Sequence, residues 1–315
     1  MKIRKAVITA AARGQRIFPV ADSIQKSMLP VIDKDGIYKP IIQIIAEEAF
    51  ESGIEEICIV CAPGDGKKYI EHFRTLHDAI QYAPLPDYEK EKQTSSIKNL
   101  IDRITFIVQQ EPLGYGDAVF KSRQFVGEDS FLLLSGDYLY ISYIKNVSCS
   151  KQLIDLAESE RCSVSAVNPT HEFLINKYGT LTGKTVPHKF GVYQIEKIIE
   201  KPSVTEAELE LQTPGLKSGY YLCFFGMSVL TQNLFILLEE YLYQNKGKQI
   251  LLTPVLQKLA EREKYFALEI LGNRYDTSKK LGLMQAQLAL GLSSNMKDEI
   301  MQMIIETVGN AVIRS

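Results

Sequence analysis

The chain has 315 residues, a formal net charge of −2 and a hydrophobic fraction of 45%. This slightly acidic balance lacks the overall basic field typical of nucleic-acid binding, and no apolar run is long enough to cross a bilayer. The composition therefore favours a globular protein with no nucleic-acid and no membrane partner. The N-terminus shows no apolar secretory leader, which predicts a cytoplasmic location.

The five cysteines are an odd number without the spacing of a disulfide framework. Cys58 and Cys61 form a C-x-x-C pattern, but they lie inside an apolar run that we expect to be a strand. Residues three apart in a strand point to opposite faces of the sheet. We therefore predict buried core thiols here and not a redox or zinc site.

The first elements in the chain predict a βαβ unit. An apolar strand at 3–10 is followed by a helix at 40–52 and a second strand at 54–60. The helix has apolar residues at helical spacing, Pro40 in its first turn and Gly53 beyond its end. A strand, a helix and a strand in this order imply parallel strands in one sheet.

The segment between the first strand and this helix has the composition of a phosphate-binding loop. It begins with the small residues 10–12 and then carries Gly14, Arg16 and Lys26. Small residues let main-chain N–H groups approach a phosphate, and arginine and lysine supply positive charge. The alternative interpretation is an ordinary polar loop after an N-terminal strand.

The middle of the chain adds two strands. The expected elements are a helix at 69–80, an exposed polar insertion at about 84–99, a strand at 104–108, a glycine-containing loop and helix at 109–126, and an apolar strand at 131–134. The last strand ends in Ser135-Gly136-Asp137. Open α/β sheets bind ligands at the carboxyl ends of their strands, so Asp137 is a candidate functional carboxylate. The alternative is an aspartate in a turn after glycine.

The second half of the chain continues the alternation of strands and helices. We expect helices at 151–160, 234–243, 254–263, 279–290 and 296–308, and strands at 162–167, 178–182, 192–199, 219–225 and 265–271. There is no internal repeat and no change of composition typical of a linker. We therefore expect one α/β domain over residues 1–315, with an exposed insertion at about 84–99 and a C-terminal helix at about 296–308.

Five segments carry a family pattern in a fixed order. They are the glycine-containing loop that leads to Lys26 and MLP at 28–30, QQEPLGYGDAV at 109–119, SGD at 135–137, IIEKP at 198–202 and NRYDTSKKLGLMQA at 273–286. Together they resemble the bacterial UTP–glucose-1-phosphate uridylyltransferases, within the sugar-1-phosphate nucleotidyltransferase family. The resemblance covers nearly the whole chain, and five ordered motifs are far more specific than one.

This resemblance implies a fold and a reaction. The fold would be a Rossmann-like mixed, mostly parallel sheet flanked by helices, of the nucleotide-diphospho-sugar transferase type. The reaction would transfer a uridylyl group from UTP to glucose 1-phosphate and release pyrophosphate, with Mg²⁺ as cofactor, in a homo-oligomer. A phosphate monoester is already ionised at neutral pH, so the site would position two anions and offset their charge.

The resemblance also assigns roles to residues. The residues that would bind the nucleotide are Ala10, Ala11, Ala12, Gly14, Gln109 and Gly114. The residues that would bind the sugar phosphate are Gly179, Glu200, Lys201 and Gly219. Catalysis would rest on Arg16 at the leaving pyrophosphate, Lys26 between the phosphates, and Asp137. Asp137 and Asp276 would hold Mg²⁺, which prefers hard oxygen ligands.

The motifs also depart from the family pattern. Ala12 and Gln15 replace a glycine and a threonine of the signature loop, and Asp117 stands where the uridylyltransferases usually have histidine. Two alternatives therefore stay open. One is the same transfer with a different sugar 1-phosphate or nucleoside triphosphate, and the other is a non-catalytic nucleotide-binding homologue.

Overall fold

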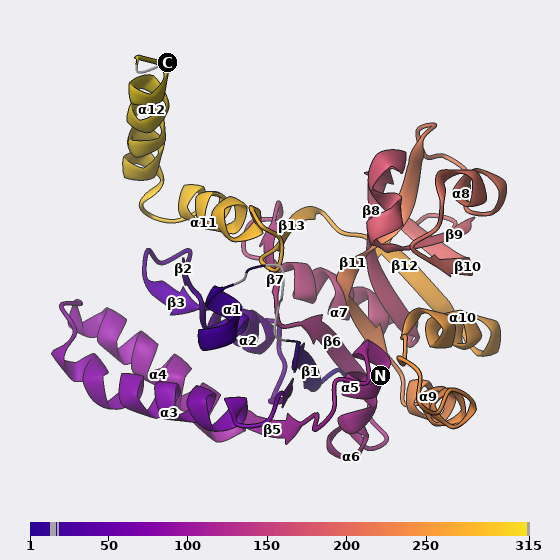
Figure 1. Ribbon diagram of the computed structural model, residues 1–315, viewed down its shortest axis with the longest axis horizontal. Helices are drawn as coiled ribbons and strands as arrows, with labels where there is room; N and C mark the ends of the chain where they lie inside the picture. Colours follow the sequence, from indigo (N-terminus) through magenta and orange to yellow (C-terminus); the bar gives the residue numbers. More distant parts are fainter. Residues whose placement is uncertain (13–16, 18, 314–315) are drawn as a thin grey trace.

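The computed structural model in Figure 1 describes residues 1–12, 17 and 19–313. A nine-stranded sheet runs through it in the order β5-β4-β1-β6-β11-β8-β12-β10-β9. The bounds of these strands are β1 (Lys5–Ala10), β4 (Glu56–Cys61), β5 (Ile104–Val108), β6 (Phe131–Ser135), β8 (Ser163–His171), β9 (Gly179–Thr185), β10 (Val192–Glu200), β11 (Tyr220–Leu230) and β12 (Tyr265–Glu269). The expectation of a mixed sheet flanked by helices is confirmed.

Parallel pairing occurs among the four strands at one end of the sheet and in one further pair of strands. Strands β5, β4, β1 and β6 are mutually parallel, and β12 is parallel to β8. Strand β11 is antiparallel to both β6 and β8, and β10 is antiparallel to β12 and β9. The expectation of a mostly parallel sheet is therefore corrected to an evenly mixed one. The connection between β9 and β10 is too short for a crossover, so those strands must be antiparallel.

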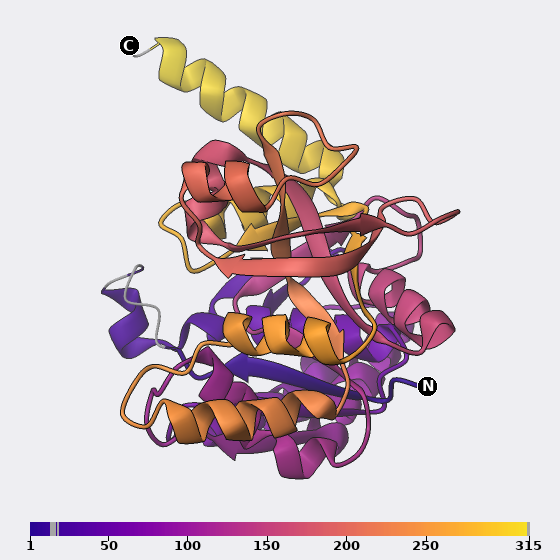
Figure 2. The same cartoon turned by 90° about the vertical axis from the view of Figure 1, so that its right-hand side faces the viewer.

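Helices cover both faces of the sheet, each over its own hydrophobic cluster. One cluster packs beneath α2 (Ile41–Glu51), α3 (Asp65–Ala79), α4 (Asp87–Arg103) and α7 (Cys149–Glu160). The other packs beneath α5 (Tyr115–Lys121), α9 (Asn233–Gln244) and α10 (Thr253–Arg262), and Figure 2 shows α9 and α10 side by side. Cys58 belongs to the second cluster and Cys61 to the first, so the predicted opposite orientation of these two buried, free thiols is confirmed.

The remaining elements complete the described chain. They are the helices α1 (Val20–Ser23), α6 (Arg123–Val126), α8 (Val204–Glu210), α11 (Gly282–Leu292) and α12 (Lys297–Ile313), the 3₁₀ helices at Lys26–Met28, Ile80–Tyr82 and Glu172–Lys177, and two two-stranded sheets, β2 (Pro30–Ile32) with β3 (Tyr38–Pro40) and β7 (Tyr138–Ser142) with β13 (Gly272–Asp276). In Figure 1, α12 projects from the body beyond α11.

Most of the segment expected to be an exposed insertion at 84–99 forms helix α4. Gln93, Ile97 and Leu100 are its buried residues, and the helix packs on α3 and α2. Their spacing of four and then three residues places them on one helical face, hidden in the sequence among charged neighbours. The C-terminal helix, expected at 296–308, extends from 297 to 313.

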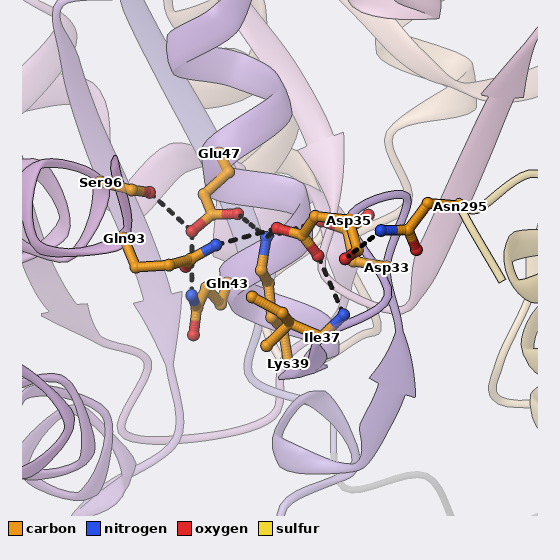
Figure 3. Close-up of polar contacts among 9 residues, drawn as sticks. All are labelled: Asp33, Asp35, Ile37, Lys39, Gln43, Glu47, Gln93, Ser96 and Asn295. Carbon is orange, nitrogen blue, oxygen red and sulfur yellow. Dashed lines mark hydrogen bonds and ion pairs between the residues drawn. The ribbon is translucent and has the colours of Figure 1, made fainter. Parts of the chain in front are cut away.

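A buried lysine ties the β2–β3 hairpin to its surroundings (Figure 3). The ammonium group of Lys39, whose residue is 5% exposed, donates to Asp33 Oδ2 at 2.8 Å, Asp35 Oδ2 at 2.7 Å and Glu47 Oε2 at 3.0 Å. Asp33 and Asp35 belong to the hairpin turn and Glu47 to α2. One ammonium group therefore forms ion pairs with three carboxylates.

Further side chains satisfy the same carboxylates from neighbouring elements. Gln93 of α4 donates to Asp35 at 2.9 Å, and Ser96 of α4 donates to Glu47 at 2.7 Å. The amide of Asn295, in the turn before α12, donates to the backbone carbonyl oxygen of Asp35 at 3.1 Å. The network thus joins the hairpin, α2, α4 and the C-terminal segment.

The charges in this network shift the pKa values of its members. Burial on its own would lower the pKa of Lys39, but the carboxylates of Glu47 and Asp33 outweigh it and raise that pKa above its ordinary value of 10.5. Burial would likewise raise the pKa of Asp35, but hydrogen bonding and charge from Lys39 bring it below 3.8. The ion pairs therefore stabilise the fold above pH 3.8 and below pH 10.5, and this stability is lost as pH falls through the Asp35 pKa or rises through the Lys39 pKa.

We predict that Lys39→Met lowers the free energy of unfolding by about 3–5 kcal/mol at pH 7, because it leaves buried carboxylates without a cation. Urea unfolding followed by circular dichroism measures this loss. Without the cation the pKa of Asp35 rises, so the deficit should shrink as the pH is lowered toward about 4. Lys98→Met, on the exposed face of α4, is the matched control and should change stability by less than about 0.5 kcal/mol. An equal effect of both substitutions would contradict the assignment.

Candidate active site

A cleft of about 1460 Å³ lies between the parallel half of the sheet and the half that contains β9 and β10. It brings together most of the residues singled out in the sequence. Those that line it are Ala11, Ala12, Lys26, Gln109, Gly114, Asp137, Gly179, Glu200, Lys201 and Asp276. Gly14 and Arg16 lie outside the described residues.

Two expected residues do not line the cleft. Ala10 is the last residue of β1 and is 1% exposed, so only Ala11 and Ala12 reach the surface of the cleft. Gly219 precedes β11 and lies beside Glu172. Strand β11 is long, and it is Gly226, near the point where β11 pairs with β6, that lines the cleft. Gly219 is therefore not among the residues that line the cleft, where the sequence had placed it.

Lys26 and Asp137 form a buried ion pair at the end of β6. Lys26 is 4% exposed, and its Nζ lies 2.5 Å from Asp137 Oδ2. The hydroxyl of Ser135 donates to the other carboxylate oxygen, Oδ1, at 2.6 Å. With so little water around it, this charge pair interacts more strongly than a surface pair would.

Glycine at position 136 allows this arrangement. A Cβ there would lie 2.9 Å from both the Cβ of Ala10 and the carbonyl oxygen of Thr9, closer than side chains tolerate. The Gly136 N–H donates to Thr9 O at 2.9 Å, and its carbonyl accepts from Ser27 Oγ at 2.9 Å. The SGD motif therefore fastens the 3₁₀ helix that carries Lys26 against the strand ends.

Asp276 reaches Asp137 through the pairing of β13 with β7. The register places Asp276 opposite Tyr138, the residue after Asp137. Thr277 then donates twice to the carbonyl oxygen of Asp137, from its backbone N–H at 3.0 Å and from its hydroxyl at 2.8 Å. The carboxylate of Asp276 accepts from Ser278 Oγ at 2.5 Å.

Asp137 and Asp276 are the two carboxylates that the sequence suggests as ligands of a divalent cation. Among the residues that the structure describes, no group of three or more acidic, histidine or cysteine side chains gathers closely enough to hold a metal ion. A site of only two carboxylates suits Mg²⁺, which commonly keeps several waters and takes further oxygens from substrate phosphates. Asp137 and Asp276 both line the cleft, where phosphates could complete such a coordination shell.

The opposite side of the cleft is built from β9 and β10. Their register pairs Gly179 with Glu200, and a Cβ at Gly179 would lie 2.8 Å from the Phe224 ring and 3.2 Å from Glu200 Oε2. Glu200 Oε2 accepts from the hydroxyl of Thr253 at 2.6 Å. Lys201 has a φ of +48°, a strained backbone for a non-glycine residue, of a kind that clusters at functional sites.

Sequence reasoning missed an aromatic and cationic group beside Asp276. The guanidinium of Arg274 lies over the rings of Tyr178 and Tyr138, at 4.5 and 5.0 Å from their centroids, and donates to Phe224 O at 2.7 Å. Lys279 donates to the Tyr178 hydroxyl at 2.6 Å. All four of these side chains, Arg274, Tyr178, Tyr138 and Lys279, line the cleft. The cations flanking Asp276 in NRYDTSKK were the available signal.

Comparison with known proteins gives consistent matches. The chain matches the nucleotidyl transferase family over residues 5–288. It is 34% identical over 312 residues to UTP–glucose-1-phosphate uridylyltransferase of Streptococcus pneumoniae, in a match that covers 97% of this chain and 96% of that protein. It is 33% identical over 313 residues to UTP–glucose-1-phosphate uridylyltransferase 2 of Streptococcus pyogenes, with 97% and 96% covered.

Solved structures agree with the sequence matches. UTP-bound UGPase from Acinetobacter baumannii has a TM-score of 0.75 at 26% identity, with 96% of this chain and 99% of that chain covered. A UDP-glucose pyrophosphorylase complexed with UDP-glucose has a TM-score of 0.71 at 29% identity, with 91% and 98% covered. The sequence and the fold therefore point to the same family.

We predict that Arg274→Met lowers the free energy of unfolding by about 1–3 kcal/mol, because it removes a charged hydrogen bond and the stacking of a cation on two rings. Chemical denaturation measures the change. Arg74→Met, at an exposed position of α3, is the control and should be nearly neutral. If Arg274→Met were as neutral as this control, the stack would not contribute to the stability of the site.

Proposed function

The chain belongs to the nucleotidyl transferase family, and on this premise we propose that it transfers a uridylyl group from UTP to glucose 1-phosphate, forming UDP-glucose and pyrophosphate. The observation that carries the proposal is the meeting of Lys26, Asp137 and Asp276 in one cleft. Gly179, Glu200 and Lys201 face the same cleft from the other half of the sheet. This arrangement suits a reaction that joins a nucleotide to a sugar phosphate.

The proposed reaction needs no protein nucleophile. A phosphate oxygen of glucose 1-phosphate attacks the α-phosphorus of UTP, the new P–O bond forms, and the bond to the β-phosphate breaks to release pyrophosphate. The protein must hold two anions in line and stabilise the charge that develops. Lys26 is buried and lines the cleft beside Asp137, and in this proposal it would contact the phosphates near the α position.

We assign the remaining roles by position in the cleft. Ala11 and Ala12 would approach the triphosphate with their backbone, and Gln109 and Gly114 would contact the uracil. Glu200 would accept hydrogen bonds from sugar hydroxyls, with Gly179 close to the hexose and Lys201 at its phosphate. Gly14 and Arg16 keep the roles that the sequence suggests for them, at the triphosphate and the pyrophosphate.

The proposed cofactor is Mg²⁺, in keeping with the general use of divalent metal ions by this family. Asp137 and Asp276 would hold it. When bound, the ion would neutralise phosphate charge and orient the reacting groups. The buried environment of Asp137 keeps these charges poorly screened by water, which strengthens their effect on the phosphates.

Three broader expectations also remain proposals. We propose that residues 1–315 form one nucleotidyltransferase domain, supported by the sheet that spans both halves of the cleft. We propose a homo-oligomer, supported by exposed apolar residues of α12 such as Met301, Ile305 and Val308. We propose a cytoplasmic location. Among the described residues, no helix is long and apolar enough to cross a membrane.

A pyrophosphate-release assay tests the proposed function. With Mg²⁺ present, we expect the highest kcat/KM for UTP with glucose 1-phosphate, in a panel of the common ribonucleoside triphosphates and several hexose 1-phosphates. Faster pyrophosphate release with another pair would show that this other nucleoside triphosphate and sugar 1-phosphate are the preferred substrates. Nucleotide binding without release from any pair would establish the non-catalytic alternative.

We predict that Asp137→Ala lowers kcat by at least about 100-fold, because it removes a carboxylate at the centre of the phosphate site. Asp298→Ala, in the first turn of α12, is the control and should keep wild-type kcat. Circular dichroism checks that both variants are folded. A near-normal kcat for folded Asp137→Ala would disprove the assignment of Asp137.

A further inference from the structure

The nucleobase end of the cleft contains a buried carboxylate that none of the roles above uses. Asp117 lies in the first turn of α5 and is 2% exposed. Gln109, which follows β5, is 6% exposed and lines the cleft, whereas Asp117 does not. Asp117 therefore stands behind Gln109 and acts on the cleft through that residue.

Asp117 and one backbone group bind the amide nitrogen of Gln109. Gln109 Nε2 donates to Asp117 Oδ2 at 2.8 Å and to the carbonyl oxygen of Gly114 at 3.1 Å. A carboxylate and a carbonyl can only accept hydrogen bonds, so the amide nitrogen must face them and the amide cannot be reversed. Both N–H groups of the amide are used in these bonds.

A lysine on the same helix forms an ion pair with the Asp117 carboxylate. Lys121 Nζ lies 3.4 Å from Asp117 Oδ1, one helical turn further along α5. A carboxylate has no N–H or O–H to donate and acts only as a hydrogen-bond acceptor. It therefore cannot offer a proton to the oxygen of the Gln109 amide, which would be the way to stabilise the reversed orientation.

The backbone around the amide is also held in place. The loop at Gly114 is fastened to residue 250 by two hydrogen bonds, from Gly116 N to Ile250 O and from Ile250 N to Leu113 O, both at 2.8 Å. A Cβ at Gly114 would lie 2.6 Å from Ile250 O, and its φ is +114°. The carbonyl of Gly114 that accepts from Gln109 thus belongs to a rigid loop.

The oxygen of the Gln109 amide, Oε1, is the atom left to contact a ligand. With the nitrogen occupied, Gln109 offers a base only its oxygen, Oε1, and that oxygen accepts no hydrogen bond from any residue in the described part of the chain. On its pairing edge uracil has a single donor, the N3–H, between two carbonyl acceptors. Cytosine has an unprotonated N3. If cytosine bound in the same position, the lone pair of N3 would face Oε1, and two acceptors cannot form a hydrogen bond with each other.

We propose that Asp117 is a positioning residue for nucleotide specificity. It orients the Gln109 amide so that Oε1 accepts from the N3–H of the base, which selects uridine over cytidine nucleotides. This inference rests on the proposed uridylyl transfer and adds a specific selection mechanism to it. Asp117 does not touch the reacting phosphates, so its effect belongs to nucleotide recognition.

The test compares UTP and CTP in the wild type and in Asp117→Asn. Asparagine has the same shape, but its own amide can donate to Gln109 Oε1 and so permit the reversed orientation. We expect the ratio of kcat/KM for UTP over CTP to fall by about 10-fold or more, mainly through KM, because a buried polar group becomes mispaired with uracil. Asp155→Asn, on an exposed turn of α7, is the control and should leave the ratio unchanged.

A purely structural role of Asp117 gives a different result. In that case kcat/KM would fall for UTP and CTP alike and the ratio would stay constant, which would overturn the proposal. Absence of UTP turnover in the wild type would instead disprove the proposed function itself, so the two failures are distinguishable.

A second measurement needs no variant, in case Asp117→Asn does not fold. The wild-type protein should bind N3-methyl-UTP, which lacks the N3–H, at least about 10-fold more weakly than 5-methyl-UTP, which keeps it. Equal binding of the two methylated nucleotides would show that Oε1 does not accept from N3 and would overturn the proposal.

Discussion

The antiparallel pairing of β7 with β13 is the interaction on which the rest of the site depends. It brings Asp276 beside Asp137 although the two residues are far apart in the chain. Side chains alternate between faces along a strand, so a slip of one residue would turn Asp276 away from its partner. The two hydrogen bonds from Thr277 to the carbonyl oxygen of Asp137 hold this register. Arg274, stacked on Tyr138 across the same ribbon, packs the pairing from the side of the cleft.

A second constraint acts on the segment between β1 and α2. This segment carries Lys26 at one end and the β2–β3 hairpin at the other. Contacts at Gly136 hold the first end at the strand termini. The ion pair of Lys39 with Glu47 holds the second end on α2, and the hydrogen bond from Gln93 to Asp35 holds it on α4. The anchor at Lys39 uses buried charges that are paired, since an unpaired charge there would be strongly destabilising. The segment that carries Lys26 is therefore held at both of its ends.

Each half of the sheet contributes a different group of residues to the cleft. The parallel half presents Lys26, Gln109 and Asp137 at the carboxyl ends of its strands, as expected for a nucleotide site in an α/β sheet. The other half presents Gly179, Glu200 and Lys201 from an antiparallel pair. Because β11 joins the halves by pairing with both β6 and β8, the two groups of residues keep a fixed separation. This rigidity suits a reaction that depends on alignment of two bound anions.

The sequence by itself determined the main strands and helices, the mixed α/β class and ten of the residues that line the cleft. These features follow from local patterns, namely apolar periodicity, glycine at strand ends and ordered motifs such as SGD and IIEKP. Only the tertiary structure decided the even mixture of parallel and antiparallel strands, the helical form of α4, the exclusion of Gly219 from the cleft, and the contacts of Arg274 and Lys39. It also decided that Asp117 faces Gln109. Each of these depends on which distant segments meet, and burial patterns within one segment carry no information about the partner that covers it.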